Sequence, residues 1–242
     1  MDKDIKKFKE IIQISKKIVV FTGAGVSYES GIPTYRGTGG VWSKYDPSIY
    51  ANIEIFMEDS SYYWNYFKDE RYPTIKNAKP NLVHKKIVEL EKKNKILRVI
   101  TQNIDGLHQL AGSKNIIELH GNTRRINCLR CNKNYTLDEV FEKLKKEIPP
   151  LCSCGGPLKT DTVLFGESLP MDALIEAENV SKKCDLFLVL GSSLVVYPAA
   201  NLPIIAKKNN SKLVIINIDP TPFDDIADIV INKNASEVLS NI

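Results

Sequence analysis

The feature that most restricts the fold of this chain is an alternation of short apolar runs with longer amphipathic segments. The apolar runs lie at 18–21, 96–101, 116–119, 186–190, 213–216 and 229–231. Short continuous runs rich in Val and Ile are typical of parallel strands that are covered on both faces. The helical patterns that separate them lie at 4–16, 81–93, 103–111 and 198–208. The sequence therefore predicts an α/β fold with a doubly wound, mostly parallel sheet of the Rossmann type.

Two segments interrupt this alternation and predict a second, smaller domain. Residues 37–80 are rich in Pro and aromatic side chains, which predicts loops and short helices that form a cover. Residues 124–156 contain four of the five cysteines. We therefore expect a large domain made of 1–36, 81–123 and 157–242, into which the helical cover and the cysteine module are inserted.

The four clustered cysteines predict a structural zinc ion. They form one close pair, Cys128 and Cys131, and after twenty intervening residues a second, Cys152 and Cys154. Each pair can give two thiolates to one metal, and four thiolates complete a tetrahedron that leaves no open position for catalysis. The fifth cysteine, Cys184, stands alone ahead of an apolar run, and we expect it in the core.

Polar residues and glycines follow several predicted strands at the point where each strand ends. These segments are Gly23-Ala24-Gly25, Gln102-Asn103-Ile104-Asp105, His120-Gly121, Gly191-Ser192-Ser193 and Asn217-Ile218-Asp219. In an open α/β sheet, ligands bind beyond the carboxyl ends of the strands, so we expect these segments to form one site. The first segment could bring backbone N–H groups to a phosphate, although an ordinary βα turn has the same composition.

Of the three histidines, His120 is the strongest candidate for a general base. It ends a predicted strand beside a glycine, and imidazole titrates near neutral pH. His84 lies in a helical pattern, which favours packing or surface exposure. His108 lies in the helix predicted after the loop at 102–105, where a structural role and a place near the site stay equally open.

Composition disfavours some classes of function. The chain has 33 Lys and Arg against 29 Asp and Glu, and this net charge of +4 is too small to favour a nucleic-acid binder. No apolar run reaches the roughly 18 residues that a membrane-spanning helix needs. The N-terminus lacks the apolar stretch of a signal peptide, so we expect a cytoplasmic protein with no membrane site and no direct nucleic-acid site.

Taken together, these segments resemble the sirtuin family. The motifs that carry the resemblance are Gly23–Ser27 with Ser30–Gly37, Thr101–His108, Glu118–Gly121, Val163–Glu167, Gly191–Leu194 and Asn217–Asp219. They run in the order typical of the family across nearly the whole chain, with the four-cysteine module in its expected place. Two positions depart from the family pattern, because Thr34 stands where an Asp is frequent and Tyr35 where a Phe is usual.

The resemblance implies an NAD-dependent protein-lysine deacylase that consumes NAD as a co-substrate. The products would be free lysine, nicotinamide and O-acyl-ADP-ribose. His120 would take a proton from a ribose hydroxyl, and Asn103 would hold the ribose and a water. The residues that would bind NAD are Gly23, Ala24, Gly25, Tyr28, Tyr35, Arg36, Gln102, Asn103, Ile104, Asp105, His120, Gly191, Ser192, Ser193, Asn217, Asp219 and Ala235. Those that would bind the acyl-lysine are Val163, Phe165, Gly166 and Val195.

The resemblance leaves the substrate open, since the acyl-lysine partners could be DNA-packaging proteins or metabolic enzymes. A subset of the family that removes acidic acyl groups carries a Tyr and an Arg three residues apart in the helical cover. The matching places here hold Phe67 and Glu70, with Arg71 adjacent, so we expect acetyl or longer apolar chains in preference to succinyl. The alternatives are a mono-ADP-ribosyltransferase and a non-catalytic NAD-binding module. The presence of His120, Asn103 and Asp105 weakens the non-catalytic alternative.

Overall fold

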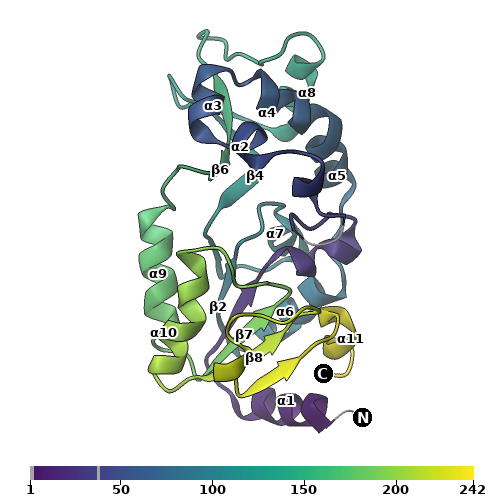
Figure 1. The fold of residues 1–242 in the computed structure, drawn as a ribbon, viewed down its shortest axis with the longest axis vertical. Coiled ribbons are helices and arrows are strands. Elements are labelled where there is room, and N and C mark those ends of the chain that lie inside the picture. The colour runs from purple at the N-terminus through teal and green to yellow at the C-terminus, as the bar shows by residue number, and fades with distance from the viewer. Residues whose placement is uncertain (1–2, 37–38) are drawn as a thin grey trace.

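The computed structural model describes residues 3–36 and 39–242, which form a large and a small lobe along the long axis (Figure 1). Within these ranges the large lobe holds a parallel sheet of six strands in the order β3-β2-β1-β7-β8-β9. Its strands are β1 (Ile18–Thr22), β2 (Ile96–Thr101), β3 (Ile116–Glu118), β7 (Leu186–Leu190), β8 (Lys212–Ile216) and β9 (Ile229–Ile231). The predicted doubly wound α/β fold is confirmed.

Helices cover both faces of this sheet, as Figure 1 shows. One face packs against α1 (Lys3–Ile14), α6 (Leu82–Lys92) and α11 (Ala235–Leu239). The other face packs against α9 (Met171–Ser181) and α10 (Leu202–Lys208). Over the described ranges, no helix combines the length and the apolarity that crossing a membrane would require.

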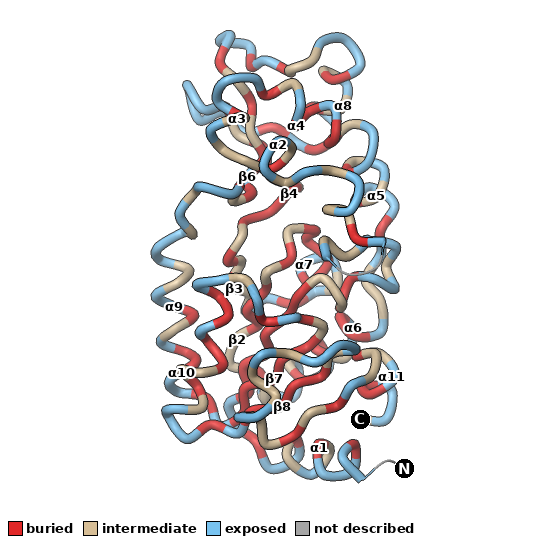
Figure 2. The backbone as a smooth tube through the Cα atoms, viewed as in Figure 1, coloured by how far each residue is buried: buried red, intermediate tan, exposed pale blue. Residues whose placement is uncertain are grey.

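The strands of the large sheet contribute side chains to two separate cores. Successive residues of a strand point to opposite faces, so Val20 and Leu188 enter one core while Val19 and Phe187 enter the other. Figure 2 shows β7 and β8 as largely buried, and every residue of β7 is buried. Burial on both faces explains why these strands read as unbroken apolar runs in the sequence.

The small lobe combines a short antiparallel sheet with a layer of helices. In the part of the chain that the structure describes, this sheet has the order β5-β4-β6, with β4 (Gly121–Cys128), β5 (Asn134–Tyr135) and β6 (Leu158–Thr162). The helical segments are η3 (Val41–Ser43), α2 (Pro47–Tyr50), α3 (Ile53–Glu58), α4 (Ser61–Tyr66), η4 (Phe67–Arg71), α5 (Tyr72–Asn77) and α8 (Leu137–Leu144). The short helices predicted for the cover are therefore present, while its first two positions, 37 and 38, lie outside the described residues.

Two local features differ from the sequence-based expectation. The helix predicted over 103–111 begins only at Leu107, as α7 (Leu107–Ala111), so that prediction is wrong for its first turn. Gly106 has a φ of +73°, and the Asp105 carboxylate accepts a hydrogen bond from the Leu107 N–H, so the chain turns before the helix starts. Helices α8, α9 and α11 have no counterpart among the predicted helices, and α9 lacks a long apolar stripe that would have indicated it. The remaining short segments are η1 (Ala24–Val26), η2 (Tyr28–Ser30), η5 (Ala199–Asn201) and η6 (Asp224–Ile226).

Candidate active site

The strand order places a topological switch point between β1 and β7. From β1 the chain continues on one side to β2 and β3, whereas β7 and β8 lie on the other side, and ligands of such sheets bind where the order reverses. The loops after β1 and β7 meet there, because the Gly25 N–H donates to the Gly191 carbonyl over 2.9 Å. A Cβ on Gly23 would lie 2.7 Å from that same carbonyl oxygen, so the close approach of the two loops requires a glycine.

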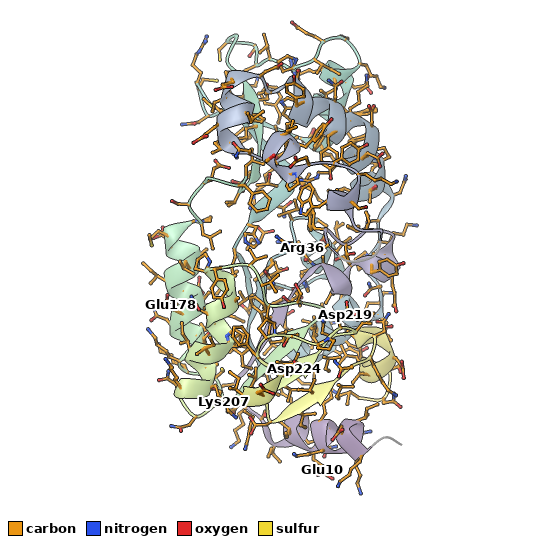
Figure 3. All side chains as sticks on the ribbon, viewed as in Figure 1. Glu10, Arg36, Glu178, Lys207, Asp219 and Asp224 are labelled. Carbon is orange, nitrogen blue, oxygen red and sulfur yellow. The ribbon has the colours of Figure 1, made fainter. Side chains whose placement is uncertain are left out.

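A cavity of about 650 Å³ opens above this switch point, between the large sheet and the small lobe. The predicted site residues that line it are Gly23, Ala24, Gly25, Tyr28, Tyr35, Arg36, Gln102, Asn103, Ile104, His120, Val163, Phe165, Gly166, Gly191, Ser192, Ser193, Asn217, Asp219 and Ala235. Figure 3 labels Arg36 at the waist of the molecule and Asp219 at the carboxyl end of β8. The structure thus brings segments from five strand ends to one space of a size that suits a dinucleotide or a drug-sized ligand.

Two predicted residues lie outside the lining of this large cavity. Val195 is an exposed residue whose neighbours Val196 and Tyr197 line the cavity instead. Asp105 lines a smaller adjoining cavity of about 110 Å³. The two cavities share Ala24, Tyr35, Arg71, Asn103 and Ile104, so they are two compartments of one site. Gly37, the last residue of the first sirtuin-like motif, lies outside the described residues.

His120 follows β3 and faces the large cavity in a partly buried position. Its Nδ1 lies 3.1 Å from the carbonyl oxygen of Gln102. A carbonyl can only accept a hydrogen bond, so Nδ1 carries the proton and Nε2 keeps a lone pair. Burial lowers the pKa of His120 below its usual range, although the bond to the Gln102 carbonyl opposes that shift. The imidazole is therefore neutral at pH 7 and able to act as a base.

Asn103 is held by a buried network at the carboxyl end of β2. Its side-chain Nδ2 donates to the Gly23 carbonyl over 3.0 Å and to Ser27 Oγ over 3.1 Å. Ser27 Oγ in turn donates to Asp105 Oδ2 over 2.7 Å. Both N–H bonds of the Asn103 amide are occupied, so what this side chain offers a ligand is the acceptor Oδ1. Burial raises the pKa of Asp105 above its usual range, against the hydrogen bonds from Leu107 and Ser27.

The segment Val163–Gly166 is fastened from three sides. The Val163 N–H donates to the His120 carbonyl over 3.0 Å, and the Phe165 N–H donates to the Ala51 carbonyl of the cover over 2.8 Å. Lys159 Nζ lies 2.9 Å from Glu167 Oε2, which also accepts from the Leu164 N–H over 2.7 Å. These contacts hold an exposed edge, on which Phe165 is nearly half exposed, beside the imidazole.

The other two histidines have structural positions, which resolves the choice that the sequence left open for His108. His108 is fully buried under β1, where its Nε2 lies 3.0 Å from the Thr22 hydroxyl, and it lines neither cavity. His84 is buried in the first turn of α6 and completes a capping box with Asn81. Their rings lie 4.9 Å apart, centroid to centroid. Burial lowers the pKa of His84 to about 4 and that of His108 to about 3, so both are neutral at pH 7.

The four predicted zinc ligands converge at the far end of the small lobe. The sulfur atoms of Cys128, Cys131, Cys152 and Cys154 all lie within 4.8 Å of one another. The Sγ atoms of Cys128 and Cys154 are 3.6 Å apart, as are those of Cys131 and Cys152. A tetrahedron with zinc–sulfur bonds of about 2.3 Å puts neighbouring sulfurs about 3.8 Å apart, so the cluster fits one zinc ion. Cys184, by contrast, is buried in the large lobe as expected, against Ser211.

Sequence reasoning missed Lys159 and Arg124 and named Arg71 only as the neighbour of Glu70. Arg71 is buried and lines both cavities, with its guanidinium 5.1 Å from the centre of the Tyr66 ring. Lys159 on β6 and Arg124 on β4 line neither cavity, but they contact residues that do, since Lys159 pairs with Glu167 and Arg124 donates to the Asp105 carbonyl. Lys159 and Arg124 stand in no recognisable motif, and Arg71 is one of four consecutive charged residues, 68–71, of which the sequence does not show which one is buried.

The structure does not support the argument that Phe67 and Glu70 would exclude a succinyl group. That expectation needed Phe67 and Glu70 to line the acyl channel. Phe67 is fully buried and lines neither cavity, because it packs in the core of the small lobe. Glu70 lines the smaller cavity, where its carboxylate accepts a hydrogen bond from the Tyr45 hydroxyl over 2.8 Å. Arg71, not Glu70, reaches the large cavity.

Comparison with known proteins gives one consistent result. A model described as the Sir2 family matches residues 23–198. A protein of Archaeoglobus fulgidus named NAD-dependent protein deacylase 2 is 48% identical, with 100% of this chain and 96% of that protein covered. A protein of Thermotoga maritima named NAD-dependent protein deacetylase is 46% identical, with 96% and 94% covered.

Solved structures agree with this result. A Sir2 structure with a deacetylated peptide and 3′-O-acetyl ADP ribose superposes with a TM-score of 0.94 at 44% identity, covering 98% of this chain and 96% of that one. A Sir2 structure with a peptide and NAD⁺ gives a TM-score of 0.92 at 44% identity, covering 100% and 97%. The family model and the full-length relatives match a chain that has two lobes, a cavity at the switch point and a cysteine cluster. The chain belongs to the Sir2 family of sirtuins.

Proposed function

We propose that this protein removes acetyl groups from lysine side chains of proteins and consumes NAD in doing so. The observation that carries the proposal is the neutral imidazole of His120, with its Nδ1 fixed by the Gln102 carbonyl, at a cavity whose size suits a dinucleotide. The relatives named NAD-dependent protein deacetylases support it, as do Sir2 structures with acetylated and propionylated peptides.

The reaction converts an acyl-lysine, NAD and water into free lysine, nicotinamide and O-acyl-ADP-ribose. NAD supplies the ribose carbon that the acyl oxygen attacks, the nicotinamide that leaves, and the hydroxyl that later attacks the acyl carbon. His120 Nε2 takes the proton of that hydroxyl, for which a neutral imidazole is the required form. Asn103 Oδ1 accepts a hydrogen bond from the ribose or from a water, since its N–H bonds are already used.

We assign the compartments of the site to the parts of NAD. The glycine turn at 23–25 and the segment 191–193 approach the phosphates, because small residues there let backbone groups come close. Asn217 and Asp219, at the end of β8, receive the distant ribose. The smaller cavity, lined by Ile104 and Asp105, receives the carboxamide of nicotinamide.

The acyl-lysine enters along the edge formed by Val163–Gly166 and by the loop at Val195. Phe165 and Val195 are each nearly half exposed, which leaves apolar surface for a lysine stem. An extended peptide could pair with this edge as an added strand. Within the proposed scheme the large domain comprises 1–36, 81–123 and 157–242, while 37–80 and the zinc module at 124–156 cover the site. Lysine-acylated proteins of the cytoplasm are the proposed substrates.

The test is a panel of otherwise identical peptides that carry acetyl-, butyryl-, succinyl- or unmodified lysine, each incubated with and without NAD. We expect nicotinamide release that requires both NAD and the acetyl group, with deacetylated peptide formed in equal amount. Nicotinamide release that is independent of acylation, with ADP-ribose attached to the peptide, would instead identify a mono-ADP-ribosyltransferase. The succinyl peptide measures acyl selectivity directly. This matters because the cationic Arg71 lines the cavity and a succinyl group carries a carboxylate.

A further inference from the structure

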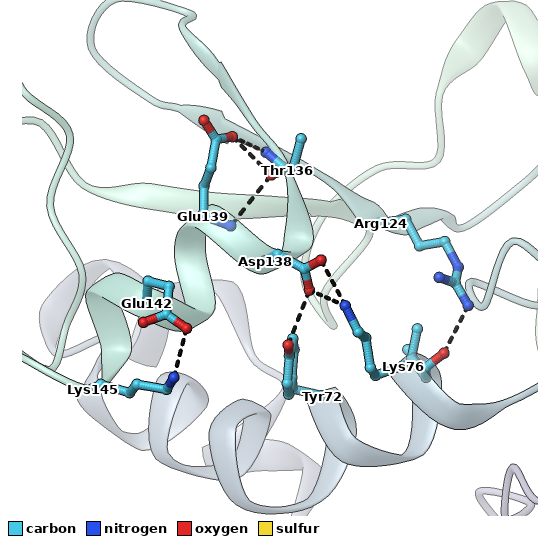
Figure 4. Close-up of polar contacts among 9 residues, drawn as sticks. Tyr72, Lys76, Arg124, Thr136, Asp138, Glu139, Glu142 and Lys145 are labelled. Atoms are coloured by element: carbon cyan, nitrogen blue, oxygen red, sulfur yellow. Dashed lines mark hydrogen bonds and ion pairs between the residues drawn. The ribbon is translucent and has the colours of Figure 1, made fainter.

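One side chain of β4 connects the loop after β2 with a helix of the cover. Arg124 Nε donates to the Asp105 carbonyl over 2.7 Å, and its Nη2 donates to the Ile75 carbonyl of α5 over 2.7 Å. Figure 4 shows the second of these bonds at the end of α5. The side chain is partly buried, and a guanidinium can hold two carbonyls at once because its N–H groups form a rigid fork.

The loop is attached to β4 at three successive residues. The Thr123 N–H donates to the Ile104 carbonyl over 2.8 Å, one residue before the bond from Arg124 to the Asp105 carbonyl. Gly106, which follows, lies directly against Arg124, since a Cβ there would come within 2.9 Å of the arginine Cδ. The position of this loop is therefore set by β4, and Arg124 extends that attachment to α5.

Helix α5 is itself braced from behind by α8, as Figure 4 shows. Lys76 forms a salt bridge with Asp138, which also accepts a hydrogen bond from the Tyr72 hydroxyl over 3.0 Å. The rings of Tyr72 and Phe141 stack with their centroids 3.7 Å apart. The part of α5 that Arg124 contacts is thus supported by α8. The two hydrogen bonds of Arg124 therefore fix the distance between α5 and the loop after β2.

The two carbonyls that Arg124 holds belong to residues on two walls of the smaller cavity, which both Ile75 and Asp105 line. We propose that Arg124 is a positioning residue that sets the width of this cavity and thereby tunes the binding and release of nicotinamide. This inference rests on the proposed function, which assigns the carboxamide to that cavity. Arg124 lines neither cavity itself, so it acts through Asp105 and Ile75 and not by contact.

The experiment compares Arg124→Met with Arg125→Met in the full-length zinc-loaded enzyme. Arg125 is the next residue of the same strand, but it is exposed and pairs with the partly buried Glu118 and the exposed Asp161, neither of which lines a cavity. For each variant we would measure the nicotinamide inhibition constant, the KM for NAD, the KM for an acetyl-lysine peptide and the melting temperature. In Arg124→Met the nicotinamide constant should rise about tenfold, as for loss of one charge-assisted hydrogen bond, with the peptide KM within about twofold. Arg125→Met should match the wild type.

A third variant keeps the test decisive if Arg124→Met folds poorly. Arg124→Lys keeps the charge, but its three N–H donors share one nitrogen, so it cannot reproduce the separate Nε and Nη2 contacts with the two carbonyls. It should fold and show an intermediate rise of roughly threefold in the nicotinamide constant, half of the tenfold effect on a logarithmic scale. Equal nicotinamide constants in the wild type and in whichever Arg124 variants fold would overturn the proposal. An equal rise in the nicotinamide constant and in both KM values, together with a lower melting temperature, would overturn it as well. If the wild type releases no nicotinamide with acetyl peptide, the proposed function fails instead.

Discussion

The two lobes are stabilised in different ways. The large lobe buries apolar side chains on both faces of its sheet, as Leu188 on one face and Phe187 on the other illustrate. The small lobe has a sheet of only three strands over the described residues, and its core includes the side chains of Cys128 and Cys152, which belong to the zinc cluster. We therefore expect the large lobe to stay folded through its apolar core alone, whereas the small lobe should need bound zinc to stay folded.

The largest effect should come from removing the zinc. In small modules, structural zinc binding contributes roughly 10 kcal/mol or more of folding free energy, so Cys128→Ala should unfold the small lobe. Both tryptophans, Trp42 and Trp64, lie in the cover, so tryptophan fluorescence reports on that lobe. We expect a red-shifted emission while most of the helical circular dichroism signal stays.

The matched control is Cys184→Ala, because Cys184 is a buried cysteine of the large lobe outside the cluster. It should keep stoichiometric zinc and native tryptophan emission. Should Cys128→Ala lose zinc yet keep its emission spectrum and melting temperature, the contrast between the lobes would be disproved.

The second effect concerns the chemistry at the junction of the lobes. His120→Ala removes the base but leaves the glycine turn and the segment 191–193 intact, so NAD should still bind. General bases contribute about 10²–10⁴ in rate, and we expect turnover to fall about a thousandfold. Calorimetric titration with NAD separates binding from turnover, and a variant that kept more than a tenth of wild-type turnover would refute the role of His120.

The third effect is a weakness of the large lobe towards acid. The folded-state pKa values of about 4 for His84 and about 3 for His108 lie below the value of 6.5 for free histidine. The two buried neutral imidazoles therefore favour the folded state fully above pH 6.5. This stability is lost as the pH falls towards 4, because these histidines bind protons in the unfolded chain at a higher pH than in the folded protein. Between pH 6.5 and 5.0 we expect a loss of roughly 3 kcal/mol in unfolding free energy from the pair.

Urea unfolding followed by circular dichroism at several pH values measures this loss. A variant with His84→Gln and His108→Gln should be less stable at pH 7.5 but should show a shallower dependence on pH. Because the zinc thiolates also bind protons in acid, the comparison with this variant isolates the two histidines. Parallel curves for both proteins would show that neither imidazole contributes.

The same contrast between lobes explains what the sequence could predict. The large sheet was predictable because strands buried on both faces leave unbroken apolar runs, and parallel topology sends their carboxyl ends to one edge. The loop before Leu107 was misread as helix because apolar periodicity does not register the positive φ of Gly106. Arg124 was missed because its partners, the Asp105 and Ile75 carbonyls, are brought near only by tertiary packing.

The smallest effect should come from the contact that fastens the proposed acyl-lysine edge. Lys159 Nζ is nearly buried, lies 2.9 Å from Glu167 Oε2, and donates to the Thr162 carbonyl over 2.7 Å. Lys159→Met should loosen the edge and raise the KM for an acetyl peptide about fivefold, close to 1 kcal/mol, with the KM for NAD unchanged. Lys159→Arg should restore most of the peptide affinity, because it keeps the charge. The control is Lys182→Met, which removes an exposed pair with Glu178 at 3.8 Å on α9 and should alter neither constant. If Lys159→Met raised the KM for the peptide and the KM for NAD together, the contact would affect the whole site, and the proposal that it holds only the peptide-binding edge would be refuted.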